Sequence, residues 1–205
     1  MGTVTSVGSG NWEAGATWDS GSRAGNADDV VVASGHNVTV VQGEQANSLT
    51  VNSGGTLTVT GSRTITIDSE NGSGFAVDID GTIAHTDGAS NLSLIITTPA
   101  ATTCDFNGGS GNFHNVTINH ASCDATFHTD TTLGGDLTIT AGTFKPQGGS
   151  TITVAGDASV TGTFGVASGS GAHSFKSLTI ASGGTHVATS GTTTITGEAG
   201  TGYAL

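Results

Sequence analysis

The feature that most constrains this chain is a short alternating pattern that recurs along its 205 residues. The segment SLTVNSGGTLTV occupies residues 48–59, and the similar segment SLTIASGGTHVA occupies residues 177–188. In both segments apolar residues alternate with polar ones until a pair of glycines interrupts them. Alternation with a period of two predicts a β-strand with one buried face, and glycine permits the positive φ of a tight turn. The pattern therefore predicts a succession of short strands joined by tight turns.

Composition supports an all-β fold. The chain has 34 glycines, 2 prolines and only 10% charged residues, and it is rich in Thr, Ser and Val. β-Branched side chains fit a pleated surface, whereas residues that favour helices are few. Low charge with abundant Gly and Ser is also typical of disordered chains. The regular alternation argues against disorder here.

The strand pattern repeats with a unit of about 20 residues, which contains three short strands. Residues 137–157 form a third relative of the two segments above. A unit this short cannot bury its own apolar face, so it must stack on copies of itself. We therefore predict a right-handed parallel β-helix, or β-solenoid, with three short strands in each coil. An antiparallel sandwich gives similar strand spacing and is the alternative.

The alternation also predicts which side chains face inward. They share the apolar positions of the strands, with Thr, Asn or Asp between them. The predicted inward residues are Val38, Val40, Leu49, Val51, Leu57, Val59, Ile65, Ile67, Phe75, Val77, Ile79, Leu137, Ile139, Ile152, Val154, Leu178 and Ile180.

A longer repeat indicates the domain organisation. Residues 49–77 are matched by residues 178–205, with an offset of 129 positions at the start of the match and 128 at its end. We interpret residues 28–205 as a single solenoid domain and residues 1–27 as an N-terminal cap. The second copy stops at Leu205, so the last coil is expected to lack a cap and to expose unpaired backbone groups. This end is predicted to self-associate or to dock on another structural protein.

Residues 10–59 resemble the opening of β-helix proteins found in phage virions and among bacterial surface adhesins. The shared pattern is a Trp, a second Trp after Ala-Thr, an Asp pair before three valines, and a Gly-His pair before Val-Thr-Val. These places are filled by Trp12, Trp18, Asp28, Asp29, Gly35 and His36. The family usually has a Pro before the Asp pair, where this chain has Ala24 and Gly25. The resemblance implies a β-helix whose N-terminal end is closed by Trp12 and Trp18, and it implies no particular activity.

Charge and hydropathy exclude several classes of function. The net charge is −12, whereas a nucleic-acid-binding protein needs a basic surface, and an anionic membrane is disfavoured for the same reason. No apolar stretch approaches the length of about 18 residues that spans a bilayer. The first residues lack the basic and apolar regions of a secretory signal, so export by that route is not expected.

Polysaccharide lyases and hydrolases also use parallel β-helices, so the predicted fold is compatible with catalysis. The four basic residues are scattered, and none is near an acid cluster in the sequence. Asp78 and Asp80 share an outward face and are interpreted as solvated acids, with a weak Ca²⁺ site as the lesser alternative. We expect no enzymatic activity, no catalytic residues and no cofactor.

One segment contains nitrogen and sulfur groups that could bind zinc. The candidate metal ligands are His114, His120, Cys123 and His128. Their spacing matches no standard zinc pattern, so no metal site is predicted. Cys104 and Cys123 are 19 residues apart, close to one coil, which predicts a stacked pair. A disulfide and two inward thiols both fit this stacking.

These observations favour a non-enzymatic structural or attachment protein. The preferred hypothesis is a phage virion component on the virion surface, namely a fibre, a spike or a capsid decoration. The alternative is a bacterial adhesin or surface filament subunit, extracellular or on the cell surface. A polysaccharide-degrading enzyme is a third, disfavoured hypothesis. A surface glycan is a further candidate partner, whereas nucleic acid and membrane are not expected.

Overall fold

The structure of the chain is a computed structural model that describes residues 2–86, 91–97, 102–106, 111–165 and 169–197. These residues form 21 β-strands and one 3₁₀ helix, η1 (Gly15–Thr17). Every pairing between the described strands is parallel, and an isolated bridge between Ser6 and Trp18 is antiparallel. The predicted all-β class is confirmed, and the antiparallel alternative is wrong for these strands.

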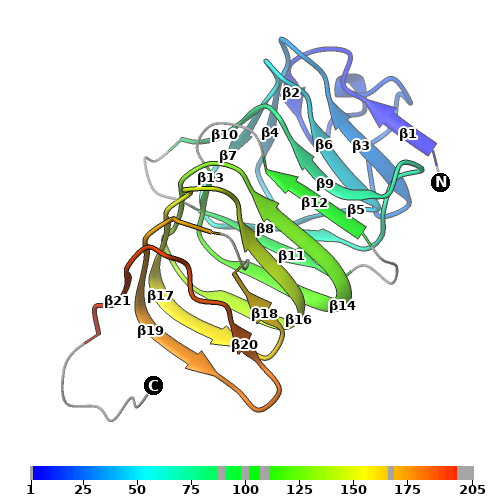
Figure 1. Cartoon of the computed structure of the whole chain (residues 1–205). Coiled ribbons are helices and arrows are strands. Elements are labelled where there is room, and N and C mark those ends of the chain that lie inside the picture. The colour runs from blue at the N-terminus through cyan, green and yellow to red at the C-terminus, as the bar shows by residue number, and fades with distance from the viewer. Residues whose placement is uncertain (1, 87–90, 98–101, 107–110, 166–168, 198–205) are drawn as a thin grey trace.

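The strands form three columns, each a line of parallel strands that runs along the molecule (Figure 1). The first column contains β1 (Gly2–Thr5), β3 (Asp28–Val32), β6 (Ser48–Val51), β9 (Phe75–Ile79), β12 (Thr102–Phe106), the ends of β14 (Val116–Phe127) and β16 (Leu137–Pro146), β18 (Thr163–Phe164) and β20 (Thr185–His186).

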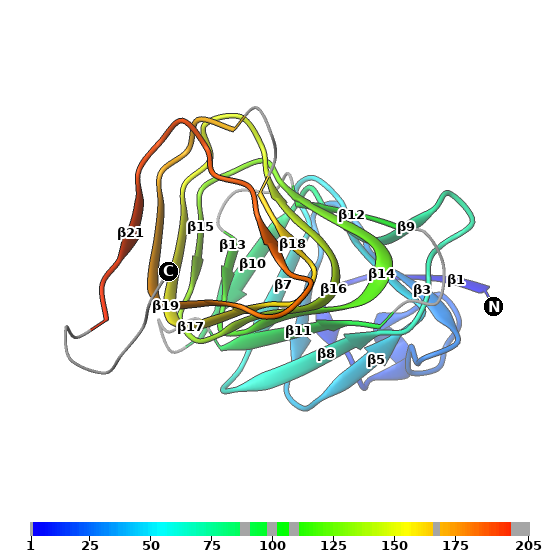
Figure 2. The same ribbon diagram turned by 60° about the horizontal axis from the view of Figure 1, so that its bottom comes forward.

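The second column begins with the four-stranded sheet and continues on the same side of the molecule (Figure 2). It contains β2 (Gly10–Asn11), β4 (Asn37–Val40), β7 (Thr56–Val59), β10 (Thr82–His85), β13 (Gly111–Phe113), β15 (Thr131–Leu133), the starts of β17 (Ile152–Val160) and β19 (His173–Ile180), and β21 (Thr193–Ile195).

The third column contains β5 (Glu44–Ala46), β8 (Arg63–Ile67), β11 (Leu92–Ile96), the starts of β14 and β16, and the ends of β17 and β19.

The chain visits the three columns in turn. Leu49 lies in β6, Leu57 in β7 and Ile65 in β8, which places one residue in each column. The next passage of the chain pairs on these strands, and neighbouring strands in a column are about 4.8 Å apart. β1 and β2 already pair with β3 and β4, so parallel stacking begins before residue 28, inside the segment that we expected to be a separate cap.

A continuous apolar core lies between the columns. All the residues predicted to face inward are buried except Phe75, which is half-buried, and Ile180, which is 39% exposed. The register between β9 and β12 shifts after Phe75, so that Ala76 and Val77 are both buried and Phe75 moves outward. Ile180 lies at the end of β19 and pairs with Val160 on one side.

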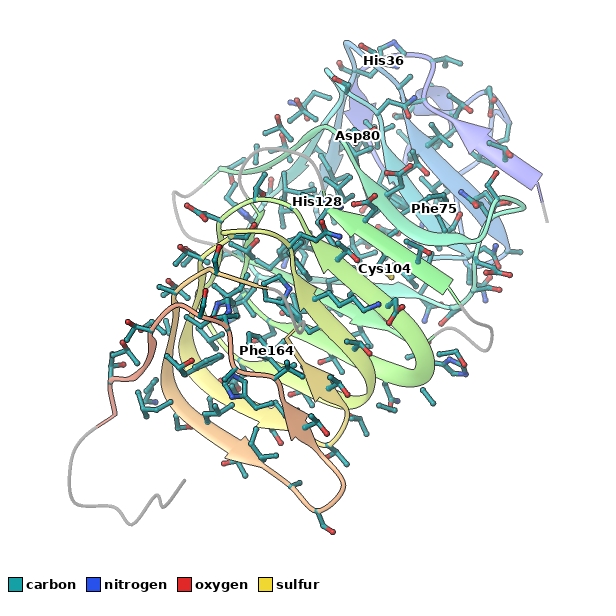
Figure 3. The ribbon with its side chains drawn as sticks, in the orientation of Figure 1. His36, Phe75, Asp80, Cys104, His128 and Phe164 are labelled. Atoms are coloured by element: carbon teal, nitrogen blue, oxygen red, sulfur yellow. The ribbon has the colours of Figure 1, made fainter. Side chains whose placement is uncertain are left out.

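A ladder of phenylalanine rings fills the core beneath the first column. Phe106 stacks on Phe127 and Phe127 on Phe144, each with ring centroids 4.2 Å apart, and Phe164 follows at 5.4 Å from Phe144. His186 continues the stack at 5.5 Å from Phe164, which Figure 3 labels. Aromatic pairs contribute about 0.5–1.5 kcal/mol each beyond their buried area. The ladder therefore fixes how successive passages of the chain align.

The two repeated segments form the same turn. Gly54 and Gly183 occupy equivalent places and have φ values of 79° and 89°. In each turn the N–H of the next glycine donates to the carbonyl oxygen three residues earlier, at 2.7 and 2.9 Å. Residues with a Cβ rarely adopt this φ, so glycine is required at both places.

The repeated segments nevertheless occupy different columns. Leu49 lies in β6 of the first column, whereas its match Leu178 lies in the part of β19 that belongs to the third column. What repeats is therefore a local unit of strand, turn and strand. The two copies of this unit lie in different columns around the core. The end of the second copy, residues 198–205, lies outside the described residues.

We expect Phe127→Ala to lower the free energy of unfolding by about 3–5 kcal/mol, because it opens a cavity between two stacked rings. Urea denaturation monitored by circular dichroism measures this loss. Phe75→Ala is the matched control, because the half-buried Phe75 side chain leaves a smaller cavity. Equal losses for the two variants would contradict the role of the ladder.

Candidate functional site

Acidic side chains gather on the outer face of the first column. Asp78 in β9 and Asp105 in β12 are register partners on adjacent parallel strands, about 4.8 Å apart along the column. Burial, reinforced by Asp80 and Asp105, raises the pKa of Asp78 above its usual value. The Nε2 atom of His128 lies 2.8 Å from an Asp105 carboxylate oxygen. Sequence reasoning paired Asp78 with Asp80 and missed Asp105, whose position depends on the pairing of the two strands.

This acidic group has the charge to attract a cation but not the surroundings of a catalytic site. A hydrolase holds its two carboxyl groups in a cleft that excludes water and binds the sugar. Asp78 and Asp105 instead lie on the outer face of a sheet, and Asp80 is exposed. Asp78 and Asp105 are therefore half-buried acids of this outer face, and Asp80 is a solvated one.

The candidate metal ligands do not converge. Cys123 is buried, whereas His120 on the same strand is half-buried and accepts a hydrogen bond from the N–H of Ser122 at 3.2 Å. His128 is exposed and contacts the carboxylate described above, and His114 precedes β14. In the described part of the chain, no three His, Cys, Asp or Glu side chains are grouped so that they could hold a metal ion.

The cysteine pair is close in space but offset in register. Cys104 in β12 lies opposite Ala125 in β14, and Cys123 lies opposite Thr102. The two sulfur atoms approach to 3.6 Å in the core, which Figure 3 marks at Cys104. We predicted direct stacking from the 19-residue spacing, whereas the register partners at this point are 21 residues apart. The prediction of an in-register pair is wrong by two residues.

A buried carboxylate occurs near the N-terminal end of the third column. The side chain of Glu44 in β5 is fully buried, and its Oε2 atom accepts a hydrogen bond from Arg23 at 2.6 Å. Burial, opposed by Arg23 and reinforced by Glu13, raises the pKa of Glu44 from 4.5 to about 7. Glu44 and Arg23 line a hollow of about 510 Å³ at the surface. We therefore expect the carboxyl group of Glu44 to change its protonation state near neutral pH.

Three of the four basic residues lie beside a single acid from a distant part of the sequence. Besides Arg23, Lys145 contacts Asp124 and Lys176 lies 3.9 Å from Asp157. The two lysine contacts join residues about one coil apart, and sequence proximity could not reveal them.

Trp12 and Trp18 are buried together at the N-terminal end. Their rings meet edge to face with centroids 5.4 Å apart. The indole N–H of Trp12 donates to the carbonyl of Ala24 at 3.1 Å, and that of Trp18 donates to the carbonyl of Trp12 at 2.7 Å. Both indole N–H groups thus have a hydrogen-bond acceptor inside the core, as buried indoles require.

No family model matches the chain, and no curated protein and no solved structure is significantly similar to it. Among the described residues there is no helix with the length and hydropathy needed to cross a bilayer. The function is therefore inferred from the residues and faces of the molecule itself.

We expect the free energy of unfolding to fall as the pH rises from about 4.5 to about 7. In this window the folded protein keeps a proton on Glu44 that the unfolded chain has already released, and above it the effect is constant. Glu44→Gln, which cannot ionise, should flatten this part of the curve measured by urea denaturation. Gln45→Asn, which changes the exposed neighbour of Glu44 in β5 without removing an ionisable group, is the control and should leave the slope unchanged.

We expect Cys104 and Cys123 to remain thiols in air. Their Cα atoms, offset by two residues on adjacent strands, are about 8 Å apart from strand spacing and rise, too far for a disulfide. Thiol titration should find two reactive groups after unfolding without reductant.

The double variant Cys123→Ala with Ala125→Cys moves the second sulfur directly opposite Cys104. This variant should form a disulfide under the same conditions. A disulfide in the unmodified protein, confirmed by mass spectrometry, would contradict the observed register.

Proposed function

We propose that the chain is a right-handed parallel β-helix with three short strands and about 20 residues per coil. We further propose that it is a non-enzymatic structural or attachment protein. The observation that supports both is the set of three columns around one continuous apolar core. A stacked repeat of this kind is a stiff rod whose long outer faces and ends are available for binding.

The preferred setting is the surface of a phage virion, as a fibre, a spike or a capsid decoration. The resemblance of residues 10–59 to virion and adhesin β-helices supports this setting, and the net charge of −12 disfavours nucleic acid and anionic membrane as partners. A bacterial adhesin or surface filament subunit is the alternative. Neighbouring genes for capsid and portal proteins would favour the first, and genes for secretion and anchoring would favour the second.

Docking through the C-terminal part of the molecule is the second element of the proposal. Ile180 in β19 and Ile195 in β21 are 39% and 36% exposed, and both belong to the last described strands. Exposed apolar side chains beside a strand edge on which no described strand pairs favour association. At the opposite end, Trp12 and Trp18 are buried. A second copy, another structural protein or a surface glycan would complete the contact.

The absence of enzymatic activity is also part of the proposal. Two of the four basic side chains, Arg23 and Lys145, are held in close ion pairs, and the acids of the first column lie on an open face. A lyase needs a free cation beside the substrate acid, and a hydrolase needs enclosed carboxyl groups. A panel of acidic and neutral polysaccharides should yield no reducing or unsaturated ends.

We expect the protein to associate as its concentration rises, and Ile180→Asp with Ile195→Asp to reduce this association. Charges at these two positions oppose burial of the apolar contact. Light scattering after size-exclusion chromatography measures the mass. Val7→Asp is the matched control, since Val7 is 59% exposed near the N-terminal end. A monomer at every concentration would contradict docking of one copy on another.

A further inference from the structure

Two histidines face the core near the last described strands. His173 begins β19 and His186 ends β20, and Figure 1 shows both strands at the C-terminal end of the molecule. His173 is only 1% exposed, and His186 is half-buried. Both imidazoles contact the ring of Phe164, His173 edge to face and His186 stacked, with centroids 5.3 and 5.5 Å from it. The two imidazoles therefore share one apolar part of the core.

The buried nitrogen atoms of these rings lack hydrogen-bond partners in the described part of the chain. This holds for both ring nitrogens of His173 and for Nε2 of His186. The register partners of His173 are Ile152 in β17 and Thr193 in β21. A protonated imidazole is a cation with two donors, and a buried cation needs acceptors or a counter-charge. The surroundings of His173 therefore accommodate its ring in the neutral form.

No acid among the described residues faces this part of the core. The elements packed around His173 are β17, β18, β20 and β21, and apart from the two histidines the charged residues of these strands and of β19 are Asp157 and Lys176. Both are exposed, and their side chains lie 3.9 Å apart on the outside. Burial lowers the pKa of both imidazoles, and His186 lowers that of His173 further.

The strands that hold these rings are easier to open than strands in the middle of the molecule. β20 pairs with β18 and β21 pairs with β19, and no described strand pairs on the other side of β20 or β21. In a stacked repeat each passage is stabilised by its neighbours, so a passage with one described neighbour loses fewer interactions when it opens. β19 also contains Ile180, and β21 contains Ile195, which are the residues of the proposed docking contact.

We propose that His173 and His186 cause the C-terminal strands β19, β20 and β21 to open in mildly acidic solution. An imidazole in an opened strand takes up its proton near pH 6.5, whereas the buried ring does so at a lower pH. The stability of the closed strands is therefore lost as the pH falls below this value. Opening displaces Ile180 and Ile195, so acid also weakens association. The opening does not depend on docking, whereas its effect on association rests on the proposed function.

The two ends of the molecule then respond to acid in opposite directions. At the N-terminal end the raised pKa of Glu44 makes its contribution to stability grow as the pH falls from about 7. The C-terminal strands open before the remaining strands unfold in urea, because they have fewer neighbours. Their opening therefore leaves the slope that Glu44 gives to the urea transition unchanged.

Hydrogen exchange of the full chain, measured by mass spectrometry and corrected for the intrinsic pH dependence of exchange, tests the opening. Between about pH 7.5 and about pH 5.5, protection of the β19 and β21 amides should fall roughly tenfold for His173 and by a smaller factor for the half-buried His186. The amides of β6 and β7 should keep their protection and are the internal reference. Unchanged protection of β19 and β21, or an equal loss along the whole chain, would overturn the proposal.

His173→Phe and His186→Phe, in separate variants, each remove one titrating ring and keep an aromatic ring beside Phe164. Each should lose part of the pH effect, and the double variant should lose all of it. His186→Phe extends the phenylalanine ladder at a half-buried position, so it provides the test even where His173→Phe does not fold. His120→Gln is the matched control, because the half-buried His120 lies in β14, and it should retain the full effect. A full effect in the folded His186→Phe and double variants would contradict the role of the two rings.

Light scattering at the lower pH distinguishes this proposal from the proposed docking. The unmodified protein should associate less than the double variant, whose C-terminal strands stay closed at the same pH. A protein that loses protection in β19 and β21 but is monomeric at every pH retains the opening and loses the docking. Equal association of the unmodified protein and the double variant, where both form oligomers, would overturn the control of docking by the two histidines.

Discussion

The structure depends on the vertical register between each strand and the strand that pairs with it one passage of the chain later. A passage of about 20 residues is too short to bury its own apolar side chains, so its stability comes from the passages above and below. A slip of one residue would turn a strand's buried side chains outward. The side-chain interactions of the molecule must therefore hold each strand in its register.

Two ladders of side chains hold this register, one inside the core and one on the outer surface. Inside, the stacked rings of Phe106, Phe127, Phe144 and Phe164 align four successive passages. Outside the third column, the Asn115 side chain accepts from the N–H of Asp136 at 2.7 Å, and the Asp136 side chain accepts from the N–H of Asp157 at 2.8 Å. Ser177 extends this outer ladder by donating to Asp157 at 2.8 Å. An apolar and a polar series thus enforce the same alignment.

Sequence reasoning predicted the parts of the fold that depend on local alternation. It placed Leu49, Leu57 and Ile65 correctly because each lies within a regular strand. It failed where the number of residues in a passage changes, because a turn or bulge of different length shifts every later pairing. The offset of Cys104 from Cys123 and the outward shift of Phe75 have this cause. The pairing of Arg23 with Glu44 was missed because it joins a loop residue to a strand residue 21 positions later and leaves no local pattern.

The shared glycine turn at Gly54 and Gly183 connects the first column to the second in one case and the third to the first in the other. The turn therefore forms a corner at two different edges of the molecule, and the sequence around it does not encode which edge. Loss or gain of one strand with its turn would rotate everything downstream by a third of a circuit. Hydroxyl-bearing strands would then be brought into line with acidic ones. In this architecture, the number of residues in each passage of the chain around the core determines which strands share a column. An insertion or deletion in a turn can therefore change the chemical groups on one side of the molecule without altering the sequence of any strand.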